Sequence, residues 1–333
     1  MKKKLLSVLM AAVMVAGVGG VGAAQVKADD EKILGAGIYS ASDNFNSYIG
    51  KAITNACDGI FKTNIEDGQN DQSTQNNQVD TMLAKGASAV AVSVCDVTAA
   101  PTLIQKCKDA GNVPIIFFNK EITDYDVINS YENAYQVTST GGDYGASIQA
   151  QMVIDYWKEH PEMDKNGDGK LQLVYLMGDP GHTASQPRCD YLKSTIEDAG
   201  IEIDLLAEDT GMWVTATAKE KMDAWVSKYG DEIECCVAGN DAMALGALSA
   251  VEAAGFNTDG EESSKYIPIY GIDALPEILS KIESGEITGS VLQDAKTQGQ
   301  TIVKMAENLT SGKDAVDGIE GVEVEEEAKA VRV

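Results

Sequence analysis

Short apolar runs alternate with longer amphipathic segments along the chain. The first half contains the apolar runs "ILGAGIYS", "AVAVSVCD" and "VPIIFFNK", with helical patterns near residues 45–61 and 99–110. The second half repeats the pattern with "LQLVYLMG", "IECCVAGND" and "IPIYGID", each followed by a helical pattern. Strands that alternate with helices predict parallel sheets with helices on both faces. The predicted fold class is therefore α/β.

A chain of 333 residues exceeds the usual size of one hydrophobic core, so we expect two lobes. In parallel sheets, ligands bind beyond the carboxyl ends of the strands. Polar and aromatic residues that follow the predicted strands are therefore the candidates for a binding site. They are Asp43, Phe45, Asn119, His182, Arg188, Asn240, Asp241 and Asp273.

The first residues have the pattern of a secretory signal peptide. Three lysines precede an uncharged stretch that ends in small residues, with the expected cleavage site at Val26-Lys27-Ala28. We expect residues 1–28 to be removed; the alternative, a retained membrane anchor, is weakened by four glycines in the stretch. No cysteine lies in or just after this leader, so lipid attachment has no acceptor. We expect a periplasmic or secreted protein.

Charge and cysteine content narrow the class further. The formal net charge of −26 would repel nucleic acid, so we expect no nucleic-acid partner. The six cysteines could form disulfides or remain thiols. Cys235 and Cys236 are neighbours in an apolar strand, and Cys57 and Cys107 lie in helical patterns, which favours free thiols. There is no CxxC motif and there are only two histidines, which argues against a zinc site.

The stretch "MDKNGDGKLQLVYL" begins like a calcium-binding EF-hand loop. Asp164, Asn166 and Asp168 stand at positions 1, 3 and 5, and Gly169 stands at position 6. Position 12 should be a glutamate, but it is Tyr175. Either the stretch is a simple turn, or a carboxylate from elsewhere in the chain completes the loop.

Several longer stretches resemble one known family. They are "SDNFNSYIGKAI", "DGQNDQSTQNNQVDTMLAKG", "PIIFFNKE", "DKNGDGKLQLVYLMGDPGH", "DTGMWVTATAKEKMDAW", "AGNDAMALGA", "YGIDALPE" and "GSVLQDA". Together they resemble the periplasmic galactose/glucose-binding proteins of bacterial ABC transport, over essentially all of the chain after the leader. The resemblance implies the two-lobed type I periplasmic binding protein fold, in which each lobe is a mostly parallel sheet flanked by helices.

The resemblance also implies lobe boundaries. Residues 29–139 plus 293–328 would form the N-terminal lobe, and residues 140–292 plus 329–333 would form the C-terminal lobe. Hinge crossings would lie near Ser139, near Gln293 and close to the C-terminus. The family continues past its "VRV" into another strand, so the last hinge strand would be truncated at Val333.

A sugar ring needs aromatic side chains against its apolar faces and planar polar groups around its hydroxyls. By resemblance, Phe45 and Trp213 are the stacking pair. The polar rim would consist of Asp43, Asn119, His182, Arg188, Asn240, Asp273 and Gln293. From the residues alone, Trp213 could be a core aromatic, Phe45 a hydrophobic staple, and Asp43, Asn240 and Asp273 helix N-caps.

Two positions depart from the family pattern. Ala184 stands where the family has an aspartate, and Gln293 stands where it has an asparagine. The resemblance as a whole implies a hexose, D-galactose or D-glucose, which a monomeric protein delivers to an ABC transporter permease, and these two changes would alter the contacts around the sugar. An alternative is a sensor whose closed form is recognised by a chemoreceptor or a histidine kinase.

The resemblance implies how the incomplete loop would bind calcium. In the family, a structural calcium ion takes the missing carboxylate from a distant strand, and that glutamate matches Glu234. The implied Ca²⁺ ligands are Asp164, Asn166, Asp168, the backbone carbonyl of Lys170, Gln172 and Glu234.

An enzyme is the remaining class to consider. A hydrolase could pair His182 with Asp179 or Asp190, but the chain contains no GxSxG, HExxH or Walker motif. We therefore expect no enzymatic activity. A transcriptional repressor is excluded because no helix-turn-helix precedes the first strand and the charge is wrong for DNA.

Overall fold

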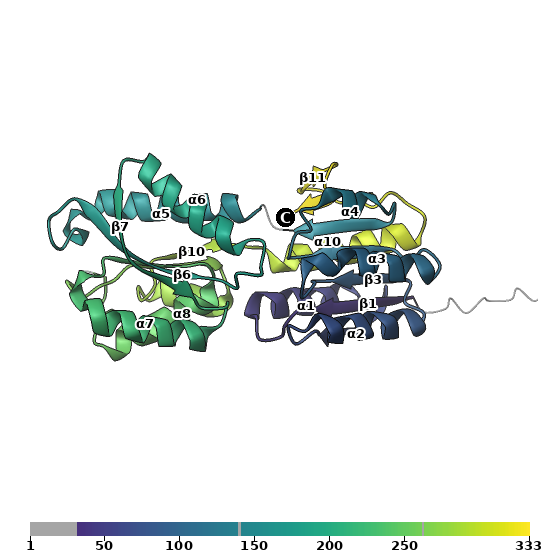
Figure 1. Cartoon of the computed structure of the whole chain (residues 1–333), viewed down its shortest axis with the longest axis horizontal. Coiled ribbons are helices and arrows are strands. Elements are labelled where there is room, and N and C mark those ends of the chain that lie inside the picture. Colours follow the sequence, from purple (N-terminus) through teal and green to yellow (C-terminus); the bar gives the residue numbers. More distant parts are fainter. Residues whose placement is uncertain (1–31, 139–140, 262) are drawn as a thin grey trace, which may run out of the picture. The chain divides into compact units, whose positions relative to one another are not determined.

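The computed structural model describes residues 32–138, 141–261 and 263–333 (Figure 1). The predicted signal peptide, residues 1–28, and the predicted hinge residue Ser139 lie outside the described residues. Two sheets of mostly parallel strands, each flanked by helices, make up the described chain. The predicted α/β class is therefore confirmed.

The first sheet has seven strands in the order β11-β12-β5-β4-β3-β1-β2. All neighbours run parallel except β11 and β12, which are antiparallel. Its strands are β1 (Ile33–Ile38), β2 (Lys62–Asp67), β3 (Ala89–Val92), β4 (Ile115–Phe118), β5 (Ala134–Thr138), β11 (Glu323–Glu325) and β12 (Ala330–Arg332).

Helices cover both faces of the first sheet. Along β3, Ala89 and Ala91 point into one core cluster, and Val90 and Val92 point into the other, because side chains alternate along a strand. The first cluster packs under α1 (Asn44–Ala56) and α10 (Ala295–Thr310). The second packs under α2 (Gln72–Ala84), α3 (Ala100–Asp109) and the short α4 (Tyr125–Asn129).

The second sheet has five parallel strands in the order β10-β9-β8-β6-β7. Its strands are β6 (Lys170–Met177), β7 (Glu202–Thr210), β8 (Cys235–Ala238), β9 (Ile269–Asp273) and β10 (Gly289–Leu292). The helices that follow its strands or precede them are α5 (Gly141–Glu159), α6 (Ser185–Asp198), α7 (Thr215–Tyr229), α8 (Asp241–Ala253) and α9 (Pro276–Glu283). Short 3₁₀ helices lie at Val97–Ala99, Pro161–Met163 and Gly230–Glu232.

The C-terminal segment does not lie where we expected it. We assigned residues 329–333 to the C-terminal lobe, but β12 pairs in parallel with β5 in the first sheet. Val331 is buried in the core of that sheet, and the backbone amide of Gln136 donates to the Lys329 carbonyl. The assignment is therefore corrected: these residues extend the sheet of the N-terminal lobe, and Figure 1 shows α10 on the same lobe.

Three inner strands are buried on both faces. Every residue of β3, β4 and β8 is buried, as expected of central strands in a parallel sheet. The edge strands β2 and β7 are polar and partly exposed. Charged side chains on an edge strand discourage pairing with another chain.

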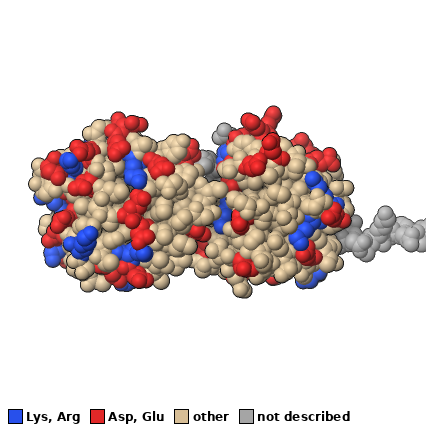
Figure 2. All heavy atoms as spheres, viewed as in Figure 1, with Lys and Arg blue, Asp and Glu red and all other residues tan. Residues whose placement is uncertain are grey.

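The described surface carries charges of both signs. Figure 2 shows acidic side chains distributed over the face in view, with Lys and Arg side chains between them. All six cysteines lie in described residues and are free, in line with the interpretation as thiols. Within the described residues, no helix has the length and apolar character needed to cross a membrane.

The close packing of α7 against α8 gives a stability prediction. A methyl group on Gly246 would lie 2.3 Å from the Thr215 carbonyl oxygen, which belongs to the backbone and cannot turn away. Gly246→Ala should therefore lower the free energy of unfolding by about 1–3 kcal/mol, measured by urea denaturation. Gly145→Ala, in α5 with nothing within 4 Å of the added methyl, is the matched control. It should raise the free energy of unfolding by about 0.5–1 kcal/mol, and equal effects of the two changes would contradict the packing argument.

Candidate functional site

One cavity collects the predicted strand-end residues of both sheets. It is lined by Asp43, Phe45, Asn119, His182, Arg188, Trp213, Asn240, Asp273 and Gln293, which are the nine residues predicted to contact a sugar. The free volume is only ≈ 20 Å³, about the space of one water molecule. A larger ligand can therefore enter only when the walls of the cavity move apart.

Asp43 lies at the junction of β1 and α1. It is the N-cap of α1, where its Oδ1 accepts a hydrogen bond from the Asn46 amide at 2.9 Å. The Tyr39 hydroxyl donates to Oδ2. Burial raises the pKa of the Asp43 carboxyl. Each oxygen keeps a free lone pair, so Asp43 can cap the helix and still accept a hydrogen bond from a ligand.

Three residues of the cavity wall have left-handed backbone conformations. They are Asn119 with φ 64°, Trp213 with φ 63° and Asp273 with φ 133°. Asparagine tolerates the αL region, but tryptophan adopts it at a cost, and the φ of Asp273 lies outside that region, which is costly for aspartate as well. Strained residues cluster at functional sites because the surrounding structure holds them there. The strained backbone at these three residues therefore indicates that the cavity is a functional site.

Trp213 forms one wall and is 4% exposed. Its six-membered ring occupies the place of a side chain at Gly178, where an added methyl would lie 2.0 Å from the ring. The Arg188 guanidinium lies 5.5 Å from the ring centroid, within cation–π range. The His182 ring contacts Trp213 edge-on at 5.4 Å. These contacts fix the ring, so its role as a core aromatic and its place in the cavity wall are compatible.

The protonation state of His182 follows from its surroundings. Its Nδ1 accepts a hydrogen bond from the Ala184 amide at 3.1 Å. Burial, followed by the positive charges of Lys120 and Arg188, lowers the pKa of the imidazole well below its ordinary value. A neutral ring with Nδ1 as acceptor carries its proton on Nε2. His182 therefore has one N–H to donate to a ligand.

Asn240 and Asp273 differ in their local roles. Asn240 is the N-cap of α8, where its Oδ1 accepts from the Met243 amide at 3.0 Å. Asp273 does not cap α9, because Leu275 holds that position. Instead, its Oδ1 accepts from the Gln293 side-chain amide at 2.6 Å. Burial and then the neighbouring Asp241 raise the pKa of the Asp273 carboxyl well above its usual range.

The cavity contains buried polar atoms with no hydrogen-bond partner among the described residues. They are the indole N–H of Trp213, Nε of Arg188 and Oδ2 of Asp273. Buried polar groups normally find a partner, and leaving one unpaired is unfavourable. Two donors and one acceptor around a cavity between aromatic side chains suit a ligand with several hydroxyls.

The geometry gives no support to the hydrolase alternative. Asp179 accepts from the Gly181 amide and Asp190 accepts from Gln186, while the Nδ1 lone pair of His182 is used by the Ala184 amide. His182 therefore has no carboxylate partner in a catalytic arrangement among these contacts.

The predicted metal loop adopts a compact turn in which side chains bond the backbone. Asp164 accepts from the amides of Asp168 and Gly169, and Asp168 accepts from the amide of Lys170. Glu234 accepts from the amides of Lys165 and Gln172, so it reaches both ends of the loop. Within the described residues, no three His, Cys, Asp or Glu side chains lie close enough together to hold a metal ion.

Two observations nevertheless bear on a cation site at this loop. The side chain of Gln172 is buried, and its Oε1 has no partner among the described residues. Glu234 is 1% exposed, and burial raises the pKa of its carboxyl. The donor set of the loop is rich in oxygen, as Ca²⁺ requires. The loop therefore has the donor types for such an ion, although in this structure its carboxylates accept hydrogen bonds from backbone amides.

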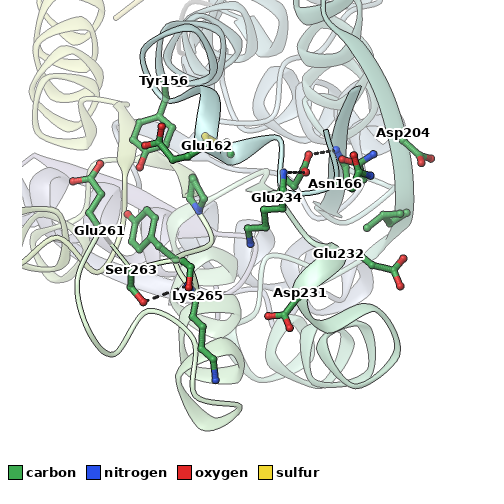
Figure 3. A pocket seen from close by; sticks show the side chains of 17 residues that line it. Tyr156, Glu162, Asn166, Asp204, Asp231, Glu232, Glu234, Glu261, Ser263 and Lys265 are labelled. Carbon is green, nitrogen blue, oxygen red and sulfur yellow. Dashed lines mark hydrogen bonds between the residues drawn. The ribbon is translucent and has the colours of Figure 1, made fainter. Parts of the chain in front are cut away.

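The loop borders a cavity of ≈ 800 Å³ that is separate from the nine-residue site. Figure 3 shows Asn166 and Glu234 in this cavity, with Tyr156, Glu162 and Glu261 on one side and Asp231 and Glu232 on another. The lining carries six acidic residues and two lysines, and Lys165 donates to the Ile233 carbonyl at 2.9 Å.

Two residues beside the first cavity were not predicted. The Tyr39 hydroxyl bonds Asp43, and the Lys120 ammonium lies 4.0 Å from the centroid of the Tyr39 ring. Lys120 is 1% exposed and donates to the Cys95 carbonyl at 2.8 Å. Tyr39 lies near the end of the apolar run "ILGAGIYS" and Lys120 ends the run "VPIIFFNK", which is the signal that the sequence offers for them.

The sequence of this chain is similar to those of known binding proteins. The family described as "Periplasmic binding protein domain" matches residues 36–314. The chain belongs to this periplasmic binding protein family. It is 42% identical, over 288 residues, to the D-galactose/methyl-galactoside binding periplasmic protein of Haemophilus influenzae, covering 86% of this chain and 83% of that protein. It is 27% identical over 289 residues to the xylitol-binding protein of Mycolicibacterium smegmatis, covering 86% and 74%.

Solved structures agree with the family. An ABC transporter solute binding protein from Bacillus halodurans with bound myo-inositol has a TM-score of 0.70 and 28% identity, covering 85% of this chain and 90% of that one. A solute binding protein from Actinobacillus succinogenes with bound D-allose has a TM-score of 0.72 and 18% identity, covering 85% and 93%, and its likeness shows the fold. The predicted family and the type of fold are confirmed, and so is the expectation of a binding protein rather than an enzyme. The family is periplasmic, which agrees with the predicted periplasmic location.

The neutral state of His182 makes stability depend on pH. The folded state resists protonation of this ring, so its contribution is present above pH ~6.5 and is lost as the pH falls below that value. Relative to His182→Gln, the wild type should lose unfolding free energy as the pH falls from ~7.5 to ~5.5, by at most about 1.4 kcal/mol per pH unit, measured by urea denaturation. His160→Gln, a change of the chain's other histidine outside the cavity, is the control. Parallel pH curves for the wild type and His182→Gln would contradict the buried neutral ring.

Proposed function

We propose that the chain binds a hexose, D-galactose or D-glucose, in the nine-residue cavity and delivers it to the permease of an ABC transporter. The observation that carries this proposal is the set of unpaired, buried polar atoms of Trp213, Arg188 and Asp273 in a cavity that also contains Phe45. Trp213 and Phe45 offer apolar surfaces to the C–H faces of a pyranose. The 42% identical relative binds D-galactose and methyl-galactoside, as its name states.

Binding would be coupled to a conformational change. The cavity walls come from both sheets, and the free volume admits about one water molecule. The walls must therefore separate to admit the sugar and close over it afterwards. A ligand that contacts both sheets stabilises the closed state, which a membrane partner can then recognise. A permease is the partner that the family supports, and recognition by a chemoreceptor stays a prediction.

Titration calorimetry tests the sugar proposal. D-galactose or D-glucose should bind with a dissociation constant of about 1 μM or tighter, since such sites bury most of a ligand. Trp213→Ala should weaken binding at least tenfold, because it removes an aromatic wall. Trp157→Ala, a tryptophan of α5 outside the cavity lining, is the matched control. Absence of binding across a panel of aldoses would overturn the proposal.

We also propose that the loop binds a structural Ca²⁺ ion through Asp164, Asn166, Asp168, the Lys170 carbonyl, Gln172 and Glu234. The support is the spacing of the loop, the unpartnered Gln172 Oε1 and the position of Glu234 against both ends of the loop. The ion would neutralise three carboxylates and tie β6 to the segment before β8. Because none of these residues lines the sugar cavity, the ion would serve the stability of the lobe.

A chelator distinguishes a calcium site from a simple turn. EGTA should lower the melting temperature of the wild type by several degrees, because an ion that binds only the folded lobe stabilises it. Sugar affinity should stay unchanged within about twofold, because the loop lies outside the sugar cavity. Asp164→Asn should abolish the response to EGTA. Asp204→Asn, an exposed acidic residue of the neighbouring cavity, is the control and should keep it. An identical melting temperature of the wild type with and without EGTA would refute the calcium site.

A further inference from the structure

A second carboxylate lies directly behind the sugar cavity. Asp241 is the first residue of α8, follows the site residue Asn240 and is completely buried. Its Oδ2 accepts from the Leu275 amide at 2.8 Å, and its Oδ1 accepts from the Ser290 hydroxyl at 2.6 Å. Asp241 thus connects α8 with the turn after β9 and with β10. It does not line the cavity.

The turn that Asp241 contacts is strained. Asp273 has φ 133° and Ala274 has φ 51°, so two consecutive residues other than glycine lie in the left-handed half of backbone space. Such conformations cost about 1–3 kcal/mol each and persist only where neighbouring groups hold them. The Ala274 amide donates to the Ser290 hydroxyl oxygen at 3.1 Å, and the same hydroxyl donates to Asp241. Asp241 therefore holds the turn both directly and through Ser290.

Close packing fixes Asp241 in this place. A methyl group added at Gly271 of β9 would lie 2.2 Å from Asp241 Oδ1, so the carboxylate occupies the space that a side chain at 271 would need. Neither the carboxylate nor the strand can shift without disturbing the other. The position of Asp241 is thus coupled to the strand that ends in Asp273.

We propose that Asp241 is a positioning residue for ligand binding: it holds the strained Asp273–Ala274 turn so that the Asp273 carboxylate points into the cavity. The proposal rests on the proposed sugar function, because it concerns the same site. It explains how Asp273 keeps Oδ2 unpaired and available while Oδ1 is held by Gln293. Without the support of Asp241, the turn would relax toward ordinary backbone angles and the Oδ2 atom would leave the cavity.

The charges around Asp241 are consistent with this role. Arg188 is attractive, while Asp273 and Glu277 are repulsive, and burial raises the pKa of Asp241 to about 6. A buried carboxylate next to a second one is unfavourable by itself. The hydrogen bonds from the Leu275 amide and the Ser290 hydroxyl offset part of this cost. Two donors that approach from two elements need two acceptor atoms, and a carboxylate supplies both.

Titration calorimetry with the hexose that binds the wild type provides the first test. Asp241→Ala should weaken binding about tenfold or more, because it leaves the Leu275 amide and Ser290 without their acceptor. Asp241→Asn should lose less, since its carbonyl can still accept from Leu275. Ser290→Ala removes one of the two contacts between Asp241 and the turn and should weaken binding about two- to tenfold. Glu252→Gln, a half-buried residue near the other end of α8, is the control and should bind like the wild type.

A double-mutant cycle with Asp273→Asn separates positioning from general stability. If Asp241 acts through Asp273, the loss caused by Asp241→Ala should shrink to about twofold in the Asp273→Asn background, since coupled residues are not additive. Equal losses in both backgrounds would overturn the proposal, as would wild-type affinity of both Asp241→Asn and Ser290→Ala. If Asp241→Ala does not fold, the same cycle is run with Ser290→Ala. A wild type that binds no sugar refutes the proposed function instead, so the two failures are distinguishable.

Discussion

Unpaired hydrogen-bonding groups in a buried cavity are the constraint on which this structure depends. The chain places the indole of Trp213, the guanidinium of Arg188 and the carboxylate of Asp273 out of water, and it leaves an atom of each without a partner. Apolar side chains of similar shape at these positions would avoid the cost of the unpaired groups. The surrounding fold tolerates the unfavourable arrangement because two buried sheets, with helices on both faces, supply the stabilising burial elsewhere.

The strained backbone serves the same constraint. Parallel strands bring their carboxyl ends together, but a strand continues straight into its loop unless the backbone turns sharply. Left-handed conformations at Asn119, Trp213 and Asp273 make that turn at the ends of β4 and β9 and after β7. Each side chain is thereby redirected into one volume. Asp43 and Asn240 are also held in the cavity wall, but by helix capping: each side chain bonds a backbone amide at a helix N-terminus, without backbone strain.

The sequence predicts the inner part of this fold better than its edges. Strands β3, β4 and β8 are wholly apolar, so their pattern is unambiguous, and Asn119 after β4 and Asn240 after β8 line the cavity. The edge strands β2 and β7 carry charges and have no such pattern. The short β12 depends on a partner about 200 residues away, which no local pattern reveals. Tyr39 and Asp241 act through other side chains, and their roles follow only from three-dimensional contacts. Gln293 and Trp213 came from the resemblance, since neither follows a strand that its own pattern defines.

The unpaired atoms of the cavity have a consequence for the lifetime of the protein in the periplasm. A ligand that satisfies them binds only the folded state, so it adds RT ln(1 + [L]/Kd) to stability, about 2.7 kcal/mol at a concentration of one hundred times Kd. Proteases attack the transiently opened chain, whose population falls as stability rises. The lifetime of the empty protein would then be shorter than that of the occupied one. The abundance of this protein would thus follow the supply of its own nutrient even at a constant rate of synthesis.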